Sequence, residues 1–328
     1  MLNYTTTSSF VFPMDFLCKK NDMNVLLFTQ RFPDEIACKE HYKNVRLKQG
    51  VICKQCGSKD HYWLASKWQF QCKCCSFRTT LRSGTMMENS NLPFRIWYLT
   101  ILFMTSTKKG ISACEMQRQL DYKRYQTIWS LMHRVRDLMG KRDNLYSLSG
   151  MIEFDEGFFE TSFSQHGRKL LKRGKGSQRQ QNVAVLAEST PLENIEDGST
   201  SSHCRFFKMR VMGSQQSDTV NDIIASNISS SSVLFSDMAT NYIDIHKIVE
   251  EHITEKSSKE TTAKSLKWVH IAISNAKRNF LGVHHKINTD YLQNYLNEFV
   301  YKLNRRYMND LFERVFVAAV FPYWYKSV

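Results

Sequence analysis

The sequence predicts a multidomain protein of the α+β and α/β classes, with small cysteine-rich and helical units first and a mixed sheet with flanking helices second. Three observations lead to this prediction. Two C-x2-C pairs stand at Cys53–Cys56 and Cys72–Cys75, two helical patterns joined by a tight turn follow between 110 and 139, and strand-like runs dominate from 151 onward. At 328 residues the chain is long enough for two or three hydrophobic cores.

The charge balance favours a polyanionic partner. Lys and Arg number 45 against 31 Asp and Glu, which gives a net charge of +14. Neutralising phosphates releases counterions, so nucleic acid or an anionic membrane surface would fit such a chain. No apolar run approaches the roughly 18 residues of a membrane span, and the N-terminus lacks the pattern of a signal peptide. We therefore expect a cytoplasmic protein with no membrane partner, whose cysteines do not form a disulfide framework.

The two cysteine pairs predict a structural zinc site formed by Cys53, Cys56, Cys72 and Cys75. Each C-x2-C turn can direct two thiolates to one side, and two such turns complete a tetrahedral Zn²⁺ site. The 15 residues between the pairs match the spacing of a zinc ribbon. Cys74 is surplus and could compete with a neighbour as ligand. We place the ribbon at 46–88, after an N-terminal helical segment at 1–45. A filled tetrahedral site leaves no open position for catalysis.

A helix-turn-helix is predicted at 89–140. Ser112 is the N-cap of a short helix with Glu115 at the capping-box position, and a second helix runs from 123 to 139 after a tight break. The second helix opens with basic and polar residues, as helices that read DNA do, although a plain helical hairpin is the alternative. The candidate DNA contacts are Arg118, Lys123, Arg124 and Gln126. Gly140 suits a helix stop, and 141–150 is expected to be a linker.

Residues 151–310 have the element order of an RNase H-like fold. Strands are predicted at 151–160, 182–188 and 204–212, a helix at 217–228 and a short buried strand at 233–237. Asp155 lies at the apolar end of the first run, and Asp237 closes the last. Carboxylates at strand ends commonly hold a divalent metal against a phosphate, although either aspartate alone could simply end a strand. A basic loop at 168–176 suits backbone phosphates or a solvated hairpin, and 189–202 is expected to be a flexible excursion.

A third metal ligand in such folds comes from a helix after the next strand, where this chain has no carboxylate. His270 and Asn275 are the candidates. Lys277 follows His270 by seven residues, about two helical turns, so both would share a face near a DNA phosphate. A core histidine is the alternative for His270. Glu153 and Glu156 are weaker ligand candidates, because strand alternation turns Glu156 to the other face of its strand.

The chain resembles bacterial insertion-sequence transposases of the ISXO-like class, which carry an N-terminal zinc ribbon and a DDE-type catalytic domain. The stretches that carry the resemblance are Cys53–Cys75, Thr80–Thr85, Gly110–Gln126, Phe154–Gly157, Ser236–Asp237, Ile273–Arg278 and Tyr291–Arg306. They extend from the front part of the chain almost to its end.

The resemblance implies a DNA transposase that cleaves at transposon ends and joins them to target DNA. It implies two catalytic Mg²⁺ or Mn²⁺ ions held by Asp155, Asp237 and His270, with Lys277 and Arg278 at the DNA. The class usually has Glu where this chain has His270, and some members have His or Asn. An imidazole nitrogen suits transition metals, so Mn²⁺ is expected to be favoured over Mg²⁺. The implied partners are the terminal inverted repeats and target DNA, bound at the nucleoid by a homodimer or larger assembly.

Two other functions fit parts of the pattern. A non-catalytic DNA-binding regulator derived from a transposase would need only the ribbon and the helix-turn-helix, and the absent third carboxylate favours it. An RNase H-like nuclease would cut DNA without joining it.

The remaining segments are an amphipathic helix at 290–306, whose basic end suits structural or phosphate contacts, and a C-terminal tail at 311–328. The inverted-repeat sequence, the target preference and the transposition route stay open.

Overall fold

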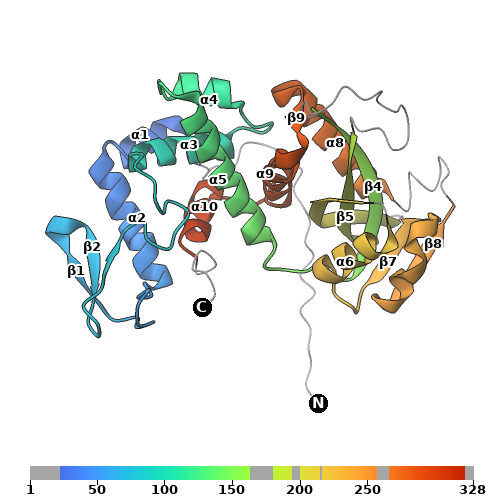
Figure 1. The fold of residues 1–328 in the computed structure, drawn as a ribbon. Coiled ribbons are helices and arrows are strands. Elements are labelled where there is room, and N and C mark those ends of the chain that lie inside the picture. Colours follow the sequence, from blue (N-terminus) through green and yellow to red (C-terminus); the bar gives the residue numbers. More distant parts are fainter. Residues whose placement is uncertain (1–22, 163–179, 194–199, 215, 257–265, 322–328) are drawn as a thin grey trace, which may run out of the picture.

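The computed structural model describes residues 23–162, 180–193, 200–214, 216–256 and 266–321. Figure 1 shows a helical half that carries a small sheet, and a second half built on a larger sheet. Helices α5 (Tyr125–Asp143) and α9 (Leu292–Asn304) lie where the two halves meet. The basic loop expected at 168–176 lies outside the described residues.

A three-stranded antiparallel sheet carries the cysteine pairs and packs on helix α2 (Glu35–Gln49). Its strands are β1 (His61–Leu64), β2 (Gln69–Cys72) and β3 (Arg78–Thr80), with the short helix η1 (Ala65–Lys67) between the first two. Cations on one face of α2 lie over aromatic rings of this unit: Lys39 over Trp68 at 5.8 Å, Lys43 over Trp63 at 5.1 Å and Arg46 over Phe70 at 5.5 Å. Cation–π contacts therefore hold the ribbon on the helix.

Helices α4 (Ala113–Gln119) and α5 form the predicted helix pair with a tight turn. The Ser112 hydroxyl accepts a hydrogen bond from the Glu115 backbone N–H at 3.1 Å, so the predicted N-cap is present. Farther along, one face of α5 is buried in a core shared with α1 (Val25–Arg31), α2 and α3 (Phe94–Ser106). The first turn of α5 is exposed at Tyr125 and Gln126. The pair is thus buried on one side and free to contact a partner at the start of α5.

The end of α5 differs from the prediction. Gly140 does not stop the helix, which continues to Asp143 and leaves only a short connection before the next strand. The glycine is needed for packing instead: a Cβ at this position would lie 2.2 Å from the Asn297 side chain on α9. The linker expected at 141–150 is therefore partly the last turn of a helix that is packed against the second half.

The C-terminal segment also departs from the expected tail at 311–328. Leu311–Ala319 form helix α10, which returns to the helical half and contacts α2, α3 and α5. Phe312, Val315 and Phe316 are buried in the same core as Phe28 and Tyr98. Helices α1 and α10, almost 300 residues apart in the sequence, thus pack in the same hydrophobic core.

The second half is built on a six-stranded sheet with the order β6-β5-β4-β7-β8, to which β9 (Ile287–Asn288) adds by pairing with β4. The long strands β4 (Met151–Ser162), β5 (Gln180–Glu193) and β6 (Thr200–Val211) are antiparallel. The short strands β7 (Val233–Asp237) and β8 (Glu251–Glu255) run parallel to β4. Three antiparallel strands come first, and the parallel strands then add to the sheet beside β4. This is the RNase H-like order that the sequence predicts.

Helices cover both faces of this sheet. Helix α6 (Ser217–Asn227) and the 3-10 helix η2 (Thr240–Lys247) cover one face over Ile152, Phe154 and Leu234. Helix α8 (Lys267–His284) and α9, which follows the short turn η3 (Thr289–Tyr291), cover the other over Phe159 and Val185. Alternate residues of β4 therefore face different helices, which decides what each of its carboxylates can reach.

The predicted strand positions are confirmed, and their lengths differ. The strand at 233–237 has the predicted bounds, whereas β4, β5 and β6 are longer than expected. The segment 189–202, expected to be a flexible excursion, continues the ladder: Thr190 pairs with His203 and Glu193 with Thr200. Residues 194–199 lie outside the described ranges. Polar sequence at the end of a hairpin does not break pairing when both strands extend together.

Buried ion pairs join the two halves where α5 packs on α9. The Arg136 guanidinium donates to Glu298 at 2.8 Å, and side-chain exposure is 0 % and 8 %. Arg305, which was open to a structural or a phosphate role, donates to Asp143 at 2.6 Å and is buried. Burial would raise the pKa of Glu298, but Arg136 and Lys302 together bring it below its usual value. The two halves are therefore connected through buried charge as well as apolar packing.

We expect Glu298→Met or Arg136→Met alone to destabilise the protein by about 3–5 kcal/mol, because each leaves a buried charge without its partner. The double variant should recover most of that loss. The lowered pKa of Glu298 means that its contribution is present at neutral pH and is lost as the pH falls below its ordinary value of 4.5. Urea unfolding of the four proteins measures these differences.

The exposed pair Asp137–Lys141 on the same helix supplies the control, with side-chain exposure of 46 % and 40 %. Its removal by Asp137→Ala should cost no more than about 0.5 kcal/mol. Equal losses for Glu298→Met and Asp137→Ala would contradict a stabilising role for the buried pair.

Candidate functional site

The two predicted aspartates lie at the same level on neighbouring strands. The parallel register pairs Glu153 with Phe235, so Asp155 and Asp237, each two residues farther on, stand side by side on one face of the sheet. Asp237 ends its strand as predicted. Asp155 does not, because β4 continues seven residues beyond it to Ser162 in its ladder with β5 and β9. What ends near Asp155 is the pairing with β7, and this opens the sheet beside it.

Helix α8 brings His270 to this pair. Its Nδ1 atom lies 3.7 Å from Asp155 Oδ2, and the two side chains are 38 % and 19 % exposed. Lys277 lies on the same side of α8, where its ammonium is 5.8 Å from the ring centroid of Phe159, also on β4. Asn275, the other candidate for third ligand, accepts a hydrogen bond from Arg278 at 2.7 Å. The structure thus brings His270 to Asp155, and engages Asn275 with the helix's own arginine.

The surroundings of Asp155 make its ionised carboxylate less favourable than it is in water. Burial raises the pKa of Asp155, and the carboxylates of Asp237 and Glu156 add to the rise, while the Glu156 backbone N–H and His270 oppose it. Glu156 itself faces the α6 side, where it accepts a hydrogen bond from the Tyr242 hydroxyl at 3.2 Å. A buried carboxylate beside another carboxylate is stabilised when a cation is bound between them.

Glu153 has a role that the sequence reasoning did not find. Its carboxylate accepts hydrogen bonds from the backbone N–H groups of Trp268 and Val269 at 2.7 and 3.1 Å, in the first turn of α8. Burial raises its pKa to about 7, against the lowering effect of these two N–H groups. The available signal was its position two residues before Asp155, since alternation places both side chains on one face.

The cysteine quartet is the tightest cluster of potential metal ligands. Among the described residues, Cys53, Cys56, Cys72 and Cys75 are the one group of three or more His, Cys, Asp or Glu whose ligand atoms all lie within 4.8 Å of one another. Asp155, Asp237 and His270 do not form a group by that criterion.

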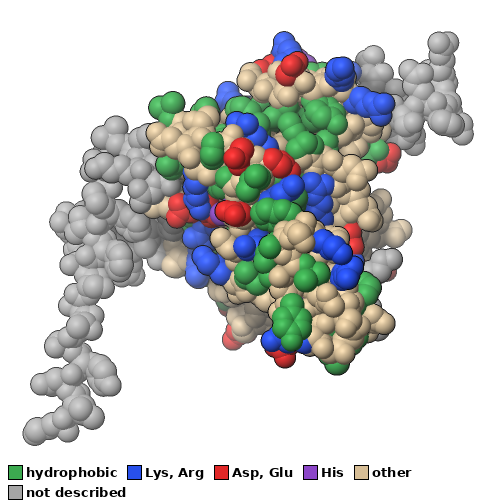
Figure 2. Space-filling model, turned by 90° about the vertical axis from the view of Figure 1, so that its left-hand side faces the viewer, with side chains coloured by type: hydrophobic (Ala, Val, Ile, Leu, Met, Phe, Trp, Pro, Cys, Tyr) green, Lys and Arg blue, Asp and Glu red, His purple; other side chains and the backbone are tan. Residues whose placement is uncertain are grey.

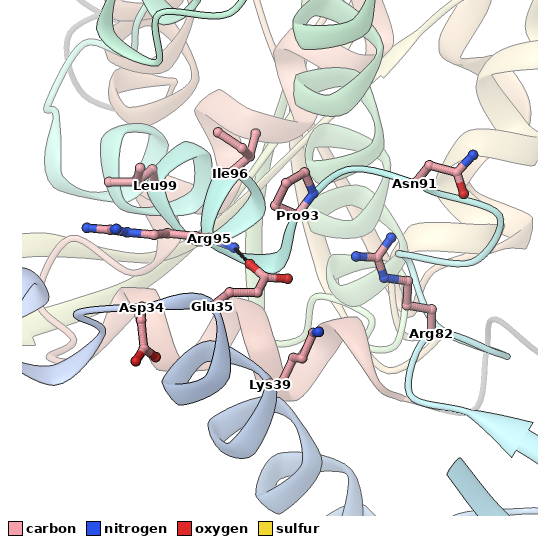
Figure 3. A pocket seen from close by; sticks show the side chains of 9 residues that line it. All are labelled: Asp34, Glu35, Lys39, Arg82, Asn91, Pro93, Arg95, Ile96 and Leu99. Atoms are coloured by element: carbon pink, nitrogen blue, oxygen red, sulfur yellow. Dashed lines mark hydrogen bonds between the residues drawn. The ribbon is translucent and has the colours of Figure 1, made fainter. Parts of the chain in front are cut away.

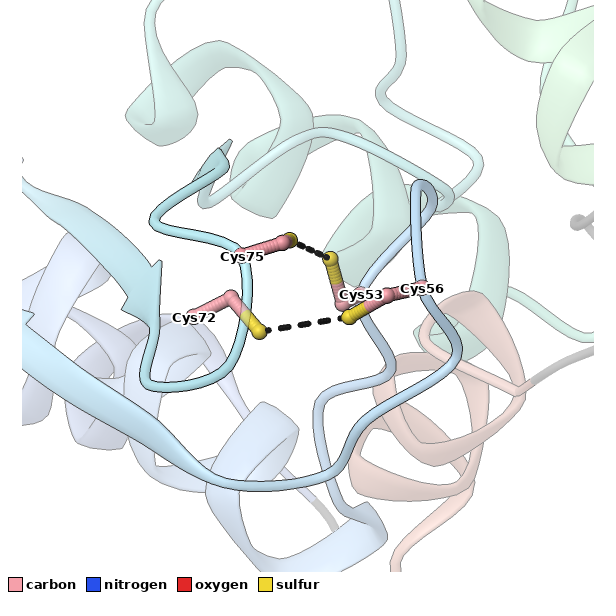
Figure 4. A group of neighbouring side chains, drawn as sticks. All are labelled: Cys53, Cys56, Cys72 and Cys75. Carbon is pink, nitrogen blue, oxygen red and sulfur yellow. Dashed lines mark hydrogen bonds between the residues drawn. The ribbon is translucent and has the colours of Figure 1, made fainter.

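The geometry of the quartet fits one tetrahedral ion (Figure 4). The Cys53 and Cys75 sulfurs are 3.5 Å apart, as are those of Cys56 and Cys72. Zn–S bonds of about 2.3 Å in a tetrahedron place sulfurs about 3.8 Å apart. Both turns repeat one backbone pattern, in which Gly57 and Ser76, at φ of +73° and +59°, donate to the carbonyls of Cys53 and Cys72. Cys74 is exposed and outside the group.

The predicted DNA contacts are solvent-exposed around the turn of the helix pair. Lys123, Arg124 and Gln126 are exposed at the start of α5. Arg118 on α4 is 76 % exposed and pairs with Glu115. Arg278 is exposed on α8. Figure 2 shows Lys and Arg side chains at several places on the face of the helical half, beside hydrophobic and acidic ones.

A separate hollow of about 760 Å³ lies between α2 and α3 (Figure 3). Its lining contains none of the predicted site residues. Its central carboxylate is already engaged, because Glu35 accepts hydrogen bonds from the backbone N–H groups of Phe94 and Arg95 at 2.9 Å each. The hollow is therefore where α2 caps the start of α3.

None of the helices that the structure describes has the length and apolar character needed to cross a membrane.

The mixed sheet of RNase H-like order and its two level aspartates lie within a segment that sequence comparison matches to a known family. Residues 147–304 match the ISXO2-like transposase domain. This part of the chain is therefore an ISXO2-like transposase domain, as the sequence motifs predicted.

Individual relatives are distant. An uncharacterized protein in transposable element ISH50 of Halobacterium salinarum is 24 % identical over 160 residues, or 48 % of this chain, and the match spans only 52 % of that protein's length. The Mos1 strand transfer complex superposes with 10 % identity and a TM-score of 0.25, over 68 % of this chain and 77 % of that one. The Mos1 transposase paired-end complex with left transposon end superposes with 9 % identity and a TM-score of 0.23, over 68 % of this chain and 79 % of that one. TM-scores of this size do not establish a common fold.

We expect Cys72→Ser or Cys75→Ser to release a metal ion from the purified protein, because each removes one of four sulfurs that face a common centre. Cys74→Ser is the matched control, since this exposed neighbour lies outside the group. Metal content measured by mass spectrometry, with a colorimetric zinc assay, should give one Zn²⁺ per chain for the wild type and Cys74→Ser. Zinc loss in Cys74→Ser with retention in Cys72→Ser would reassign the ligand.

Proposed function

We propose that this protein is an active DNA transposase that cleaves DNA at transposon ends and transfers the cut strand to target DNA. The observation that carries the proposal is the placement of His270 against Asp155, level with Asp237, inside an ISXO2-like transposase domain. The imidazole that faces Asp155 from α8 supplies a third donor beside the two carboxylates, which a DNA-binding regulator would not need. The regulator is therefore the weaker candidate.

The donor set fits divalent ions. Two carboxylates and an imidazole are ligands for Mg²⁺ or Mn²⁺, and the nitrogen favours Mn²⁺. Ions bound there would polarise the scissile phosphate and lower the pKa of an attacking water or DNA 3′-hydroxyl. Asp155, Asp237 and His270 would hold the ions, and Asp155 lies beside each of the other two. A structural Zn²⁺ in the cysteine quartet completes the proposed cofactors.

The remaining residues would orient the DNA. Lys277 shares the α8 face of His270, so its ammonium would contact a phosphate beside the acidic pair. Arg118, Lys123, Arg124 and Gln126 would bind the terminal inverted repeat at the helix-turn-helix. Handling two transposon ends and a target requires two or more copies of the chain, which would assemble on DNA in the cytoplasm at the nucleoid.

We expect Asp155→Ala to lower strand transfer by at least about 10²–10³-fold, because loss of one ligand removes several kcal/mol of transition-state stabilisation. His270→Ala should lose activity by a similar factor, and Asn275→Ala should remain within about threefold of the wild type. The assay uses DNA carrying the terminal inverted repeats and measures both cleavage and joined product in Mg²⁺ and in Mn²⁺.

The outcomes separate the functions. Cleavage without joined product would identify a nuclease, and absence of both from the wild type, with repeat binding intact, would identify a regulator. If Asn275→Ala is inactive and His270→Ala is active, Asn275 is the third ligand. Equal wild-type activity in both metals would remove the argument for Mn²⁺.

We expect Arg124→Ala to weaken binding to inverted-repeat DNA and to reduce the salt slope of log K by about 1, as one lost phosphate contact does. Lys141→Ala is the control: this side chain, 40 % exposed, lies on the same helix far from its free end and pairs with Asp137. Fluorescence anisotropy over a range of salt concentrations measures both. An unchanged slope in Arg124→Ala would place the DNA elsewhere.

A further inference from the structure

We propose that Glu153 is a positioning residue, which docks the first turn of α8 on β4 and so holds His270 against Asp155. The inference rests on the proposed function, because it names the residue that holds His270 in the proposed metal site. It gives Glu153 a role in place of its weak candidacy as a metal ligand.

The contact is made at the point where a helix needs one. The first backbone N–H groups of an α-helix have no partner within the helix, and the residue that caps α8, Leu266, provides no side-chain hydrogen bond. Glu153 supplies the acceptor from across the interface, at 2.7 Å from Trp268 N and 3.1 Å from Val269 N. In its ionised form, the carboxylate also complements the positive end of the helix dipole. The residue is 3 % exposed, so water does not compete for these bonds.

Three successive contacts fix the helix along the strand. Glu153 binds the first turn of α8, Asp155 faces His270 directly after it, and Gly157 faces Ile273. A Cβ on Gly157 would lie 3.0 Å from Phe159 Cε2 and 3.3 Å from Ile273 Cγ1, so a side chain at this position would crowd both that ring and the helix. All three strand residues alternate onto one face of β4. His270 thus lies on α8 between the hydrogen bonds to Glu153 and the close contact of Ile273 with Gly157.

The test separates the length of the side chain from its charge. Glu153→Gln keeps the length and one acceptor oxygen, whereas Glu153→Asp keeps the charge but is too short to reach the amides. For a positioning residue, we expect Mn²⁺ binding to weaken by about 10–100-fold in Glu153→Asp and Glu153→Ala, as loss of supporting partners does, and only about threefold in Glu153→Gln. Isothermal titration calorimetry with MnCl₂ on the zinc-loaded full chain measures the binding without requiring activity.

Glu188 is the matched control. It is also a buried glutamate of the same sheet, 6 % exposed, and accepts a hydrogen bond from the Ser149 backbone N–H at 3.1 Å, but it does not contact α8 in any described hydrogen bond. Glu188→Ala should lower the melting temperature while leaving Mn²⁺ binding within about threefold of the wild type. If Glu153→Ala does not fold, the comparison of Glu153→Gln with Glu153→Asp still decides.

Each result has one meaning. Wild-type Mn²⁺ binding in a folded Glu153→Asp variant overturns the inference. Loss of Mn²⁺ binding in Glu153→Gln with retained binding in Glu153→Asp also overturns the inference. That result would identify Glu153 as a metal ligand, for which the charge matters more than the side-chain length. If the wild type binds no Mn²⁺ beyond what Asp155→Ala binds, the proposed catalytic site itself fails, whatever Glu153 does.

Discussion

The pairing of β4 is the constraint on which the rest of the second half depends. This strand pairs with β5 along one edge, with β7 and β9 along the other, and its two faces are covered by different helices. The parallel register with β7 alone sets Asp155 beside Asp237. Alternation then separates the neighbouring carboxylates: Glu153 and Asp155 face α8, and Glu156 faces Tyr242 on the opposite side. One strand therefore supplies a candidate ligand, a helix anchor and a core contact within four residues.

The sequence predicted the parts of this site that local patterns encode. Cys53, Cys56, Cys72 and Cys75 have the spacing of two paired turns, and Ser112 has a capping signal, so the clustering of the four sulfurs and the N-cap follow from local sequence. The strand at 233–237 was predicted because apolar residues and a closing aspartate mark it. His270 was selected from its distance to Lys277, a helical periodicity that the α8 face reproduces.

What the sequence could not supply depends on contacts between distant segments. Gly140 resembles a helix stop when read locally, and only the approach of Asn297 from α9 explains a glycine inside α5. Leu311–Ala319 resemble a tail after the last matched motif, but their apolar face is needed to complete the core around Tyr98. Glu153 is a weak ligand candidate when read locally, and its role as an acceptor depends on the two amides that α8 supplies. In each case the partner lies more than 100 residues away.

The continuity of α5 has a consequence for how DNA recognition and the acidic pair could work together. Its 19 residues span about 28 Å, with an exposed start and an end buried against α9. Because Arg136 and Asp143 anchor that end through buried ion pairs, no flexible linker separates the start of α5 from the sheet. DNA bound at Arg124 would then lie at a distance from Asp155 that the protein sets. In the proposed transposase, such a frame would set the position of the cut by geometry and keep DNA recognition at α5 in register with the reaction at the acidic pair.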